Sequence, residues 1–187
     1  MDWTQKIRTS FAGAPLASPD ALGQRNSSVL VTVGIHEDTG LAEILLTKRT
    51  MLVDSHKGEI SLPGGHWEDH DESLMHTALR ECEEEIGIRP TDVEILGALE
   101  PVQTHQRVSI YPWVGKINLP YLFNPNPAEV DRILALPLVQ LLEEGLKPVS
   151  VRVGAINVQS EGLFFQGELV WGATARILAM FREKLVG

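Results

Sequence analysis

Four glutamates crowd into one predicted helix, and this feature constrains the chain more than any other. The pattern predicts a helix over residues 77–86, yet Glu81, Glu83, Glu84 and Glu85 lie almost side by side within it. Like charges at helical spacing repel one another. Because Glu81 and Glu85 stand one turn apart with Glu84 beside them, their carboxylates can converge on one point. Hard divalent cations favour such oxygen ligands, so the pattern predicts a metal site; the alternative is an ordinary solvated acidic face.

The rest of this helix supports a partly buried position. A separate apolar stripe at helical spacing consists of Met75, Ala78, Leu79, Cys82 and Ile86. Asp71 is the predicted N-cap, with Glu72 in the first turn. Gly87 follows the helix, where a left-handed residue commonly ends one. One face is therefore expected to be buried and the neighbouring face acidic.

A glycine pair precedes the helix and completes a known signature. Gly64 and Gly65 let the backbone turn sharply and approach a ligand closely. With Glu72 and the run Arg80-Glu81-x-x-Glu84-Glu85-x-Gly87, they resemble the box of the Nudix hydrolases, G-x5-E-x7-R-E-U-x-E-E-x-G-U, in which U is apolar. The match is complete from Arg80 to Ile88, but six residues instead of five separate Gly65 from Glu72.

This resemblance implies an enzyme that hydrolyses a nucleoside diphosphate derivative with bound Mg²⁺ or Mn²⁺. Glu81, Glu84 and Glu85 would be the metal ligands, and Arg80 would orient a carboxylate or contact phosphate. Glu72 would brace the loop against the helix. The Gly64 and Gly65 backbone would lie against the substrate. A binding module that kept the fold and lost catalysis is the alternative from another class; its hallmark would be eroded acids in the box.

A second motif resembles the coenzyme A pyrophosphatase branch of the same family. Leu45-Leu46-Thr47-Lys48-Arg49-Thr50, Gly58 and Leu62-Pro63-Gly64-Gly65 follow the branch pattern L-L-T-x-R-[SA]-x3-R-x3-G-x3-F-P-G-G. The longer glycine loop and the run from Trp171 to Leu178 also resemble that branch. Two departures from the pattern matter, because Asp54 stands at its second Arg and Leu62 at its Phe.

The branch resemblance implies coenzyme A or its thioesters as substrate, cleaved to 4′-phosphopantetheine and adenosine 3′,5′-bisphosphate, with Arg49 in substrate binding. If the missing Arg normally holds the 3′-phosphate, Asp54 would repel that group. ADP-ribose and dinucleoside polyphosphates, which lack the 3′-phosphate, are therefore the main competitors.

Composition limits the partners. Sixteen basic and 25 acidic residues give a net charge of −9, which argues against broad binding to nucleic acid or to an anionic membrane. The expected partner is a small nucleotide diphosphate, and a homodimer is compatible with this interpretation. Cys82 is the single cysteine and is expected in the core. Without a signal-like or spanning apolar stretch, a cytoplasmic protein is expected.

The remaining pattern predicts one mixed domain. Residues 1–26 are interpreted as an N-terminal helix and connector, and residues 27–187 as the Nudix domain. Strands are predicted at 27–36, 41–47, 59–62, 93–99, 108–117, 149–158 and 162–166, and further helices at 2–12, 139–144 and 171–185. Periodicity alone supports only a mixed α/β domain. The resemblance implies the Nudix fold, an α+β arrangement with a mixed β-sheet sandwiched between α-helices.

Two regions outside the box offer weaker candidates. The polar loop 103–107 contains His105 and Arg107, which would contact substrate or simply be solvated. Glu129 precedes Val130, and Nudix relatives often have a similar late acidic residue near the metals. Glu129 is therefore a candidate general base, while the alternative is a surface glutamate at the start of a strand.

Overall fold

The computed structural model describes residues 2–12, 26–53, 56–104 and 107–187. Within these ranges, one sheet has eight strands: β1 (Asn26–His36), β2 (Ala42–Arg49), β3 (Ile60–Ser61), β4 (Gly64–His66), β5 (Glu94–Ala98), β6 (Val102–Gln103), β7 (Ser109–Leu119) and β8 (Val130–Pro137). A second sheet has three: β9 (Lys147–Val153), β10 (Ile156–Phe165) and β11 (Glu168–Trp171). The α-helices are α1 (Trp3–Phe11), α2 (Leu74–Ile86), α3 (Leu138–Glu144) and α4 (Gly172–Val186).

The large sheet forks near its centre. β1 and β7 pair in parallel from Asn26↔Ser109 to His36↔Leu119. β1 pairs antiparallel with β2 only as far as Thr32↔Leu45, and its first residues pair with β4. Because β8 follows β2 along nearly its whole length, β3 and β1 must share the other edge of β2. The chain therefore crosses the opening of the fork between β3 and β4 and delivers Gly64 and Gly65 there.

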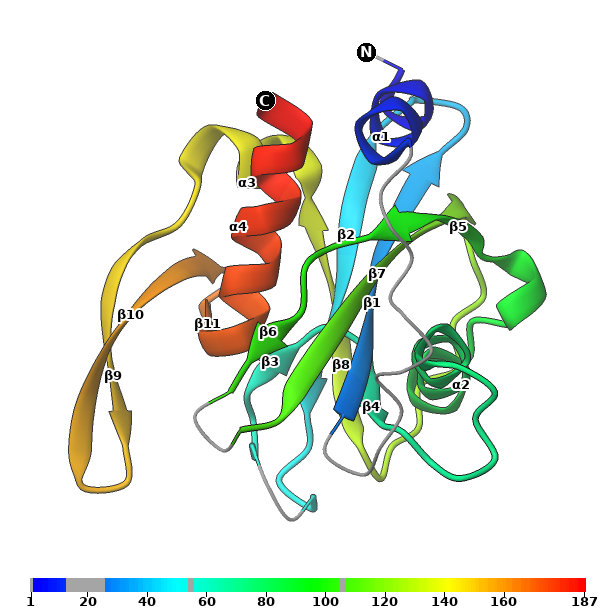
Figure 1. Ribbon diagram of the computed structural model, residues 1–187. Coiled ribbons are helices and arrows are strands. Elements are labelled where there is room, and N and C mark those ends of the chain that lie inside the picture. The colour runs from blue at the N-terminus through cyan, green and yellow to red at the C-terminus, as the bar shows by residue number, and fades with distance from the viewer. Residues whose placement is uncertain (1, 13–25, 54–55, 105–106) are drawn as a thin grey trace.

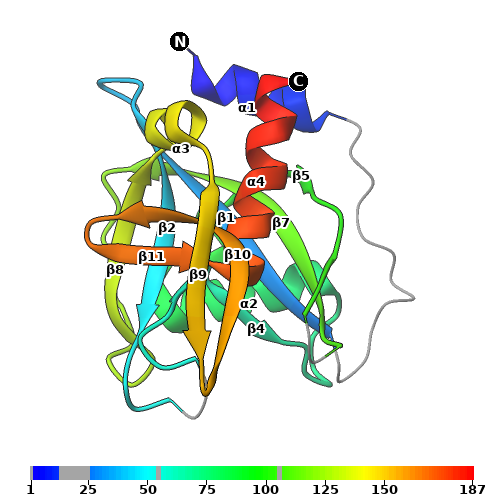
Figure 2. The ribbon, with the colours of Figure 1, turned by 90° about the vertical axis from the view of Figure 1, so that its left-hand side faces the viewer.

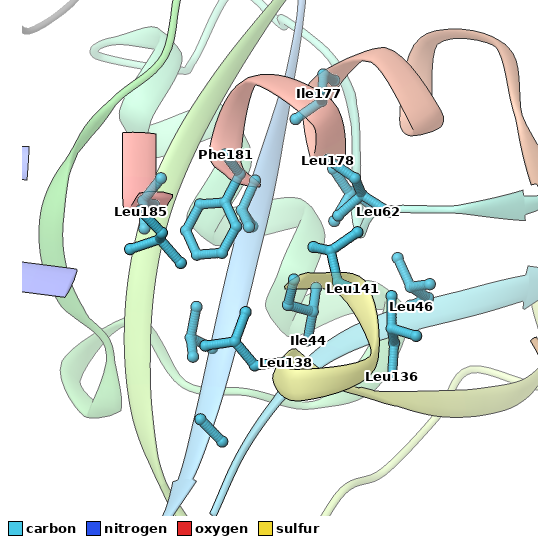
Figure 3. Close-up of a cluster of buried hydrophobic side chains, with 14 of the residues drawn as sticks. Ile44, Leu46, Leu62, Leu136, Leu138, Leu141, Ile177, Leu178, Phe181 and Leu185 are labelled. Atoms are coloured by element: carbon cyan, nitrogen blue, oxygen red, sulfur yellow. The ribbon is translucent and has the colours of Figure 1, made fainter. Parts of the chain in front are cut away.

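Helices cover both faces of this sheet, as Figures 1 and 2 show. Side chains alternate between the faces of a strand. Leu30 of β1 accordingly packs in the apolar cluster under α2, whereas Val31 and Val33 pack in the cluster under α1, α3 and α4. Figure 3 shows the latter cluster, in which Leu141 and Phe181 project from α3 and α4. The predicted fold, a mixed sheet between helices, is confirmed.

The N-terminal helix joins the larger cluster. Trp3, Ile7 and Phe11 of α1 are buried there, and the rings of Phe11 and Phe181 stack with centroids 5.6 Å apart. The predicted connector, residues 13–24, lies outside the described residues. Within the described ranges, no helix combines the length and the apolar character needed to cross a bilayer.

The strand predictions were wrong at one turn. Residues 149–158 were expected to form one strand, but β9 ends at Val153 and β10 begins at Ile156. Gly154 has φ +59°, a left-handed conformation that glycine adopts readily, so the chain reverses there into an antiparallel hairpin. Strands β4, β6, β8 and β11 were not predicted. The small sheet lies on the side of the molecule away from α2 (Figure 1).

Candidate active site

Helix α2 begins at Leu74, three residues before its predicted start, and its N-cap lies two residues after the predicted one. Ser73 is the N-cap, because its Oγ accepts a hydrogen bond from the His76 N–H at 3.1 Å. Gly87 has φ +75° and ends the helix as predicted. A Cβ at Gly87 would also lie 2.8 Å from Asn124 Cβ, so the chain packs closely against this end of the helix.

Asp71 is a buried anchor rather than an N-cap. Its carboxylate accepts hydrogen bonds from Arg80 Nε at 3.0 Å, Arg80 Nη2 at 3.1 Å, Thr77 Oγ1 at 2.9 Å and the Glu68 N–H at 3.0 Å. Burial alone would raise its pKa, but these hydrogen bonds, first among them that of Arg80, outweigh it and lower the pKa to about 2.

The structure gives Asp71 the bracing role that the resemblance assigned to Glu72. Five residues separate Gly65 from Asp71, and the Glu72 side chain is exposed. The extra residue of this chain therefore lies between Asp71 and Arg80, and not between the glycines and the brace. Counting five residues from Gly65 and allowing Asp for Glu would have identified Asp71 from the sequence.

Arg80 links the brace to two of the predicted ligands. Its Nη1 lies 3.0 Å from Glu81 Oε1 and 3.0 Å from Glu84 Oε2, while its Nη2 donates to the His66 carbonyl at 3.1 Å. The hydrogen bond with Asp71 is the main cause that raises the pKa of Arg80, so the guanidinium remains charged. The side chain can therefore orient both carboxylates.

Glu81 lies directly against the glycine pair. A Cβ at Gly65 would fall 2.4 Å from Glu81 Oε1, so a larger residue at this position would displace the carboxylate. Burial raises the pKa of Glu81, against the charge of Arg80, and the nearby carboxylates of Glu84 and Glu129 raise it further.

Glu85 is the most deeply buried of the predicted ligands. Its side chain is 2 % exposed, its Oε2 accepts from the Gly64 N–H at 3.3 Å, and its Oε1 lies 3.5 Å from Arg49 Nη1. Burial raises the pKa of Glu85 to about 8; Arg49 opposes this rise, and Glu81 and Glu129 add to it. Such mutual repulsion between buried carboxylates is relieved by a cation.

Gly64 and Arg49 both lie beside the carboxylate of Glu85. Gly64 has φ +152°, and a Cβ there would fall 2.3 Å from the Ser28 carbonyl oxygen, so only glycine fits. Arg49 Nε is buried and has no hydrogen-bond partner among the described residues. The Arg49 guanidinium, at the end of β2, therefore has donors to spare beside Glu85.

Glu129 comes to the same place from a distant part of the chain. Its carboxylate lies near enough to Glu81 and Glu85 to raise the pKa of both. Asn126 Nδ2 donates to Glu129 Oε1 at 3.1 Å. Sequence reasoning did not identify Asn126, and its only signal is the short Asn-Pro-x-Glu spacing before β8.

The donor set suits a hard divalent cation. Glu81, Glu84, Glu85 and Glu129 offer only carboxylate oxygens, which Mg²⁺ and Mn²⁺ accept. The Glu84 side chain is 55 % exposed and can rotate inward. In the part of the chain that the structure describes, no three acidic, histidine or cysteine side chains are already gathered tightly enough to hold an ion. Rotation of side chains would bring these carboxylates together around one ion.

Three other positions were singled out in the sequence. His105 and Asp54 lie outside the described residues. Arg107 is exposed and adopts φ +62° in its loop, and its backbone N–H donates to the Thr104 carbonyl at 3.0 Å.

Comparison with known proteins gives consistent results. The family model for the NUDIX domain matches residues 26–152. Over 167 residues, the chain is 35 % identical to an uncharacterized Nudix hydrolase, NudL, of Cronobacter sakazakii, covering 88 % of this chain and 84 % of that protein. It is 33 % identical over 193 residues to the chloroplastic Nudix hydrolase 22 of Arabidopsis thaliana, covering 94 % of this chain but 60 % of the plant protein. The chain thus spans under two thirds of the length of this plant relative.

Solved structures agree in fold. A Nudix hydrolase from M. smegmatis superposes with a TM-score of 0.53 at 18 % identity, covering 65 % of this chain and 76 % of that one. An Ap4A hydrolase from C. elegans superposes with a TM-score of 0.51 at 21 % identity, covering 63 % and 83 %.

Proposed function

The chain belongs to the Nudix hydrolase family, whose members act on pyrophosphate bonds, and within this family we propose that it hydrolyses coenzyme A or its thioesters. Water would add across the P–O–P anhydride to give 4′-phosphopantetheine, or its acylated form, and adenosine 3′,5′-bisphosphate. The motifs at residues 45–65 and 171–178 support this substrate. The free, buried thiol of Cys82 is compatible with action in the cytoplasm.

The observation that carries the proposal is the buried position of Glu85 beside two further carboxylates. The Glu85 carboxylate accepts one backbone hydrogen bond, lies 3.5 Å from the Arg49 guanidinium, and has the acidic side chains of Glu81 and Glu129 nearby. A protein that buries an anion among anions needs positive charge at that point. A bound Mg²⁺ or Mn²⁺ would supply it, neutralising phosphate oxygens and increasing the acidity of water. Glu81, Glu84 and Glu85 would hold this ion.

The remaining groups position the substrate. Arg49 has unused donors beside Glu85 and would hydrogen-bond to an oxygen of the diphosphate. The lack of a Cβ at Gly64 and Gly65 lets the backbone approach the same phosphates. Arg80, fixed by Asp71, would keep Glu81 and Glu84 directed toward the ion.

Glu129 would accept the proton of the attacking water. It approaches the cluster from the β7–β8 connection and not from α2, so its carboxylate reaches the site from another direction. A base that abstracts a proton from water must lie within hydrogen-bond reach of it.

The test replaces the buried ligand. Glu85→Gln keeps the side-chain volume and removes the charge, so the fold should persist while turnover falls by about 10³-fold, or ~4 kcal/mol in the activation barrier. Glu83→Gln is the matched control, because Glu83 lies on the same helix but is exposed. Product formation from coenzyme A with Mg²⁺, followed by mass spectrometry, measures both. Full activity in Glu85→Gln would overturn the proposal, and binding without products in the wild type would indicate a sensor module.

A second candidate substrate follows from Asp54. ADP-ribose and dinucleoside polyphosphates lack the 3′-phosphate that an aspartate would repel. The deciding measurement is kcat/KM for coenzyme A, 3′-dephospho-coenzyme A and ADP-ribose. We expect coenzyme A to be preferred. A tenfold preference for ADP-ribose, about 1.4 kcal/mol in transition-state binding, would make ADP-ribose the substrate instead of coenzyme A. A gain confined to coenzyme A in Asp54→Arg would show that Asp54 weakens the 3′-phosphate contact.

A further inference from the structure

Asn126 uses all of its polar groups at the junction between α2 and Glu129. Its backbone N–H donates to the Glu85 carbonyl at 2.9 Å, so Asn126 is attached to the helix at the residue that carries the buried carboxylate. Its own carbonyl accepts from the N–H groups of Glu129 at 3.0 Å and Val130 at 2.8 Å. A tight turn therefore leads from this attachment point directly into β8.

The side-chain amide of Asn126 has two different tasks. Its Oδ1 accepts from the Ala128 N–H at 3.1 Å, and its Nδ2 donates to Glu129 Oε1 at 3.1 Å. The orientation of the amide is fixed by its partners, because a backbone N–H can only donate and an ionised carboxylate can only accept. An aspartate would serve the first task and would repel Glu129 in the second.

The backbone around Glu129 is held independently of this amide. Thr50, which follows Arg49 at the end of β2, donates from its N–H to the Glu129 carbonyl at 2.8 Å. Thr50 Oγ1 donates to the Ala128 carbonyl at 2.9 Å. Removing the Asn126 amide should therefore free the Glu129 side chain while the main chain stays in place.

The Glu129 side chain needs such a tether. It is only partly buried, and it lies near the carboxyl groups of Glu81 and Glu85, whose charged forms repel it. Asn126 Nδ2 is the described donor that opposes this repulsion. The same residue fixes Glu129 and contacts the backbone of Glu85, so it sets the position of one carboxylate relative to the other.

We propose that Asn126 is a positioning residue that holds Glu129 in register with Glu85 for metal and substrate binding. This inference rests on the proposed function, because it assumes that Glu129 acts in the site. It assigns to Asn126 a supporting contact of the kind that orients ligands around metal centres, where a lost contact commonly costs 10- to 100-fold in metal affinity.

The test compares Asn126→Asp with Asn124→Asp, using the dissociation constant for Mn²⁺ measured by electron paramagnetic resonance. Both variants add one negative charge near the C-terminal end of α2 or beside Glu129, and the hydrogen bond of Asn124 to α2 runs from its backbone N–H to the Ile86 carbonyl. Charge alone would strengthen cation binding in both. We expect Asn124→Asp to bind Mn²⁺ as well as the wild type or better, and Asn126→Asp to bind it about tenfold more weakly.

A double-mutant cycle with Glu129→Gln shows whether the effect passes through Glu129. If Asn126 acts by holding that carboxylate, Asn126→Asp should change Mn²⁺ affinity little in the Glu129→Gln background. An equal loss in both backgrounds, or unchanged or stronger Mn²⁺ binding by Asn126→Asp, would overturn the inference. Should Asn126→Asp not fold, Asn126→Ser makes the same comparison, because its hydroxyl can serve the turn but cannot reach Glu129.

Failure of this inference is distinguishable from failure of the proposed function. Glu85→Gln tests the reaction through product formation, whereas the Asn126 variants are read through ion binding in the absence of substrate. Loss of turnover in Glu85→Gln together with wild-type Mn²⁺ binding in Asn126→Asp would leave the hydrolase assignment in place and refute the role of Asn126.

Discussion

The two faces of the forked sheet are built on different principles. Under α1, α3 and α4, Phe181 and Leu178 belong to one buried hydrophobic cluster that also includes residues of strands β1, β2 and β8. On the α2 face the apolar cluster is accompanied by Asp71 and Glu85, the two buried carboxylates in the described part of the chain. The first face contributes to stability alone, while the α2 face also holds Glu85, whose charge is disfavoured by burial.

The two buried carboxyl groups on the α2 face also differ in their hydrogen bonds and in the direction of their pKa shifts. Asp71 receives four hydrogen bonds, and its lowered pKa shows that the folded protein favours its charge. Glu85 receives one backbone hydrogen bond, and its raised pKa shows that burial disfavours its charge. Asp71 therefore belongs to the scaffold, and Glu85 is kept in a state that a cation would stabilise.

The largest stability effect is expected on the apolar face. Phe181→Ala removes a fully buried ring that stacks on Phe11, and such deletions cost about 3–5 kcal/mol in the free energy of unfolding. Urea denaturation measures this loss, with Phe164→Ala, at a 64 % exposed position, as the control. Mn²⁺ affinity of the folded variant should stay at the wild-type value. A marked change in Mn²⁺ affinity would mean that the two faces are not independent.

A smaller loss is expected at the scaffold charge on the other face. Asp71→Asn keeps the shape but weakens the hydrogen bonds with Arg80, at a cost of about 2–3 kcal/mol at neutral pH. Because the folded pKa of Asp71 is depressed from 3.8 to about 2, its contribution is present above pH 3.8 and is lost as the pH falls through about 2. The stability difference between wild type and variant, followed by urea denaturation across this range, should therefore shrink. A constant difference would show that Asp71 acts through shape and not charge.

The smallest effect is expected where the small sheet meets the large one. Lys48 of β2 and Arg132 of β8 are cross-strand neighbours, and Glu168 of β11 accepts from both, at 2.6 Å and 2.5 Å. The hydrogen bond from Lys48 is the main cause that lowers the pKa of Glu168. All three side chains reach solvent, so salt should screen the contact. Glu168→Gln should lower the urea midpoint slightly at low salt and negligibly at high salt, with Glu161→Gln as control. A salt-independent loss would contradict this.

The sequence was most informative where a motif is local. Helix α2, its end at Gly87 and the glycine pair follow from patterns within about 25 residues, and all are present in the structure. Asp71 was wrongly predicted as the N-cap in place of Ser73, because both residue types cap helices and only the contact with Arg80 distinguishes their roles. The β9–β10 turn was missed because Gly154, which reverses the chain, lies within the largely apolar run 149–158 that predicts a single strand.

Contacts between segments that are far apart in the sequence could not be predicted from hydrophobic periodicity. Arg49 lies beside Glu85 because the sheet forks between β1 and β2, and nothing in either segment indicates that fork. Asn126 meets Glu85 and Glu129 because the β7–β8 connection passes over the end of α2. The family resemblance could suggest Glu129, but it could not identify what holds it.

The parallel pairing of β1 and β7 has a consequence for how the chain reaches this state. Ser28 and Tyr111, which pair across these strands and share a hydrogen bond, are 83 residues apart in sequence. Closing so long a loop costs conformational entropy before any contact repays it. The hairpin of β1 and β2 and helix α2 both form from residues within that loop, and their formation shortens the stretch that remains to be closed. We therefore expect docking of β7 on β1 to come late in folding, and Glu129, which follows β7, to join the other carboxylates only after it.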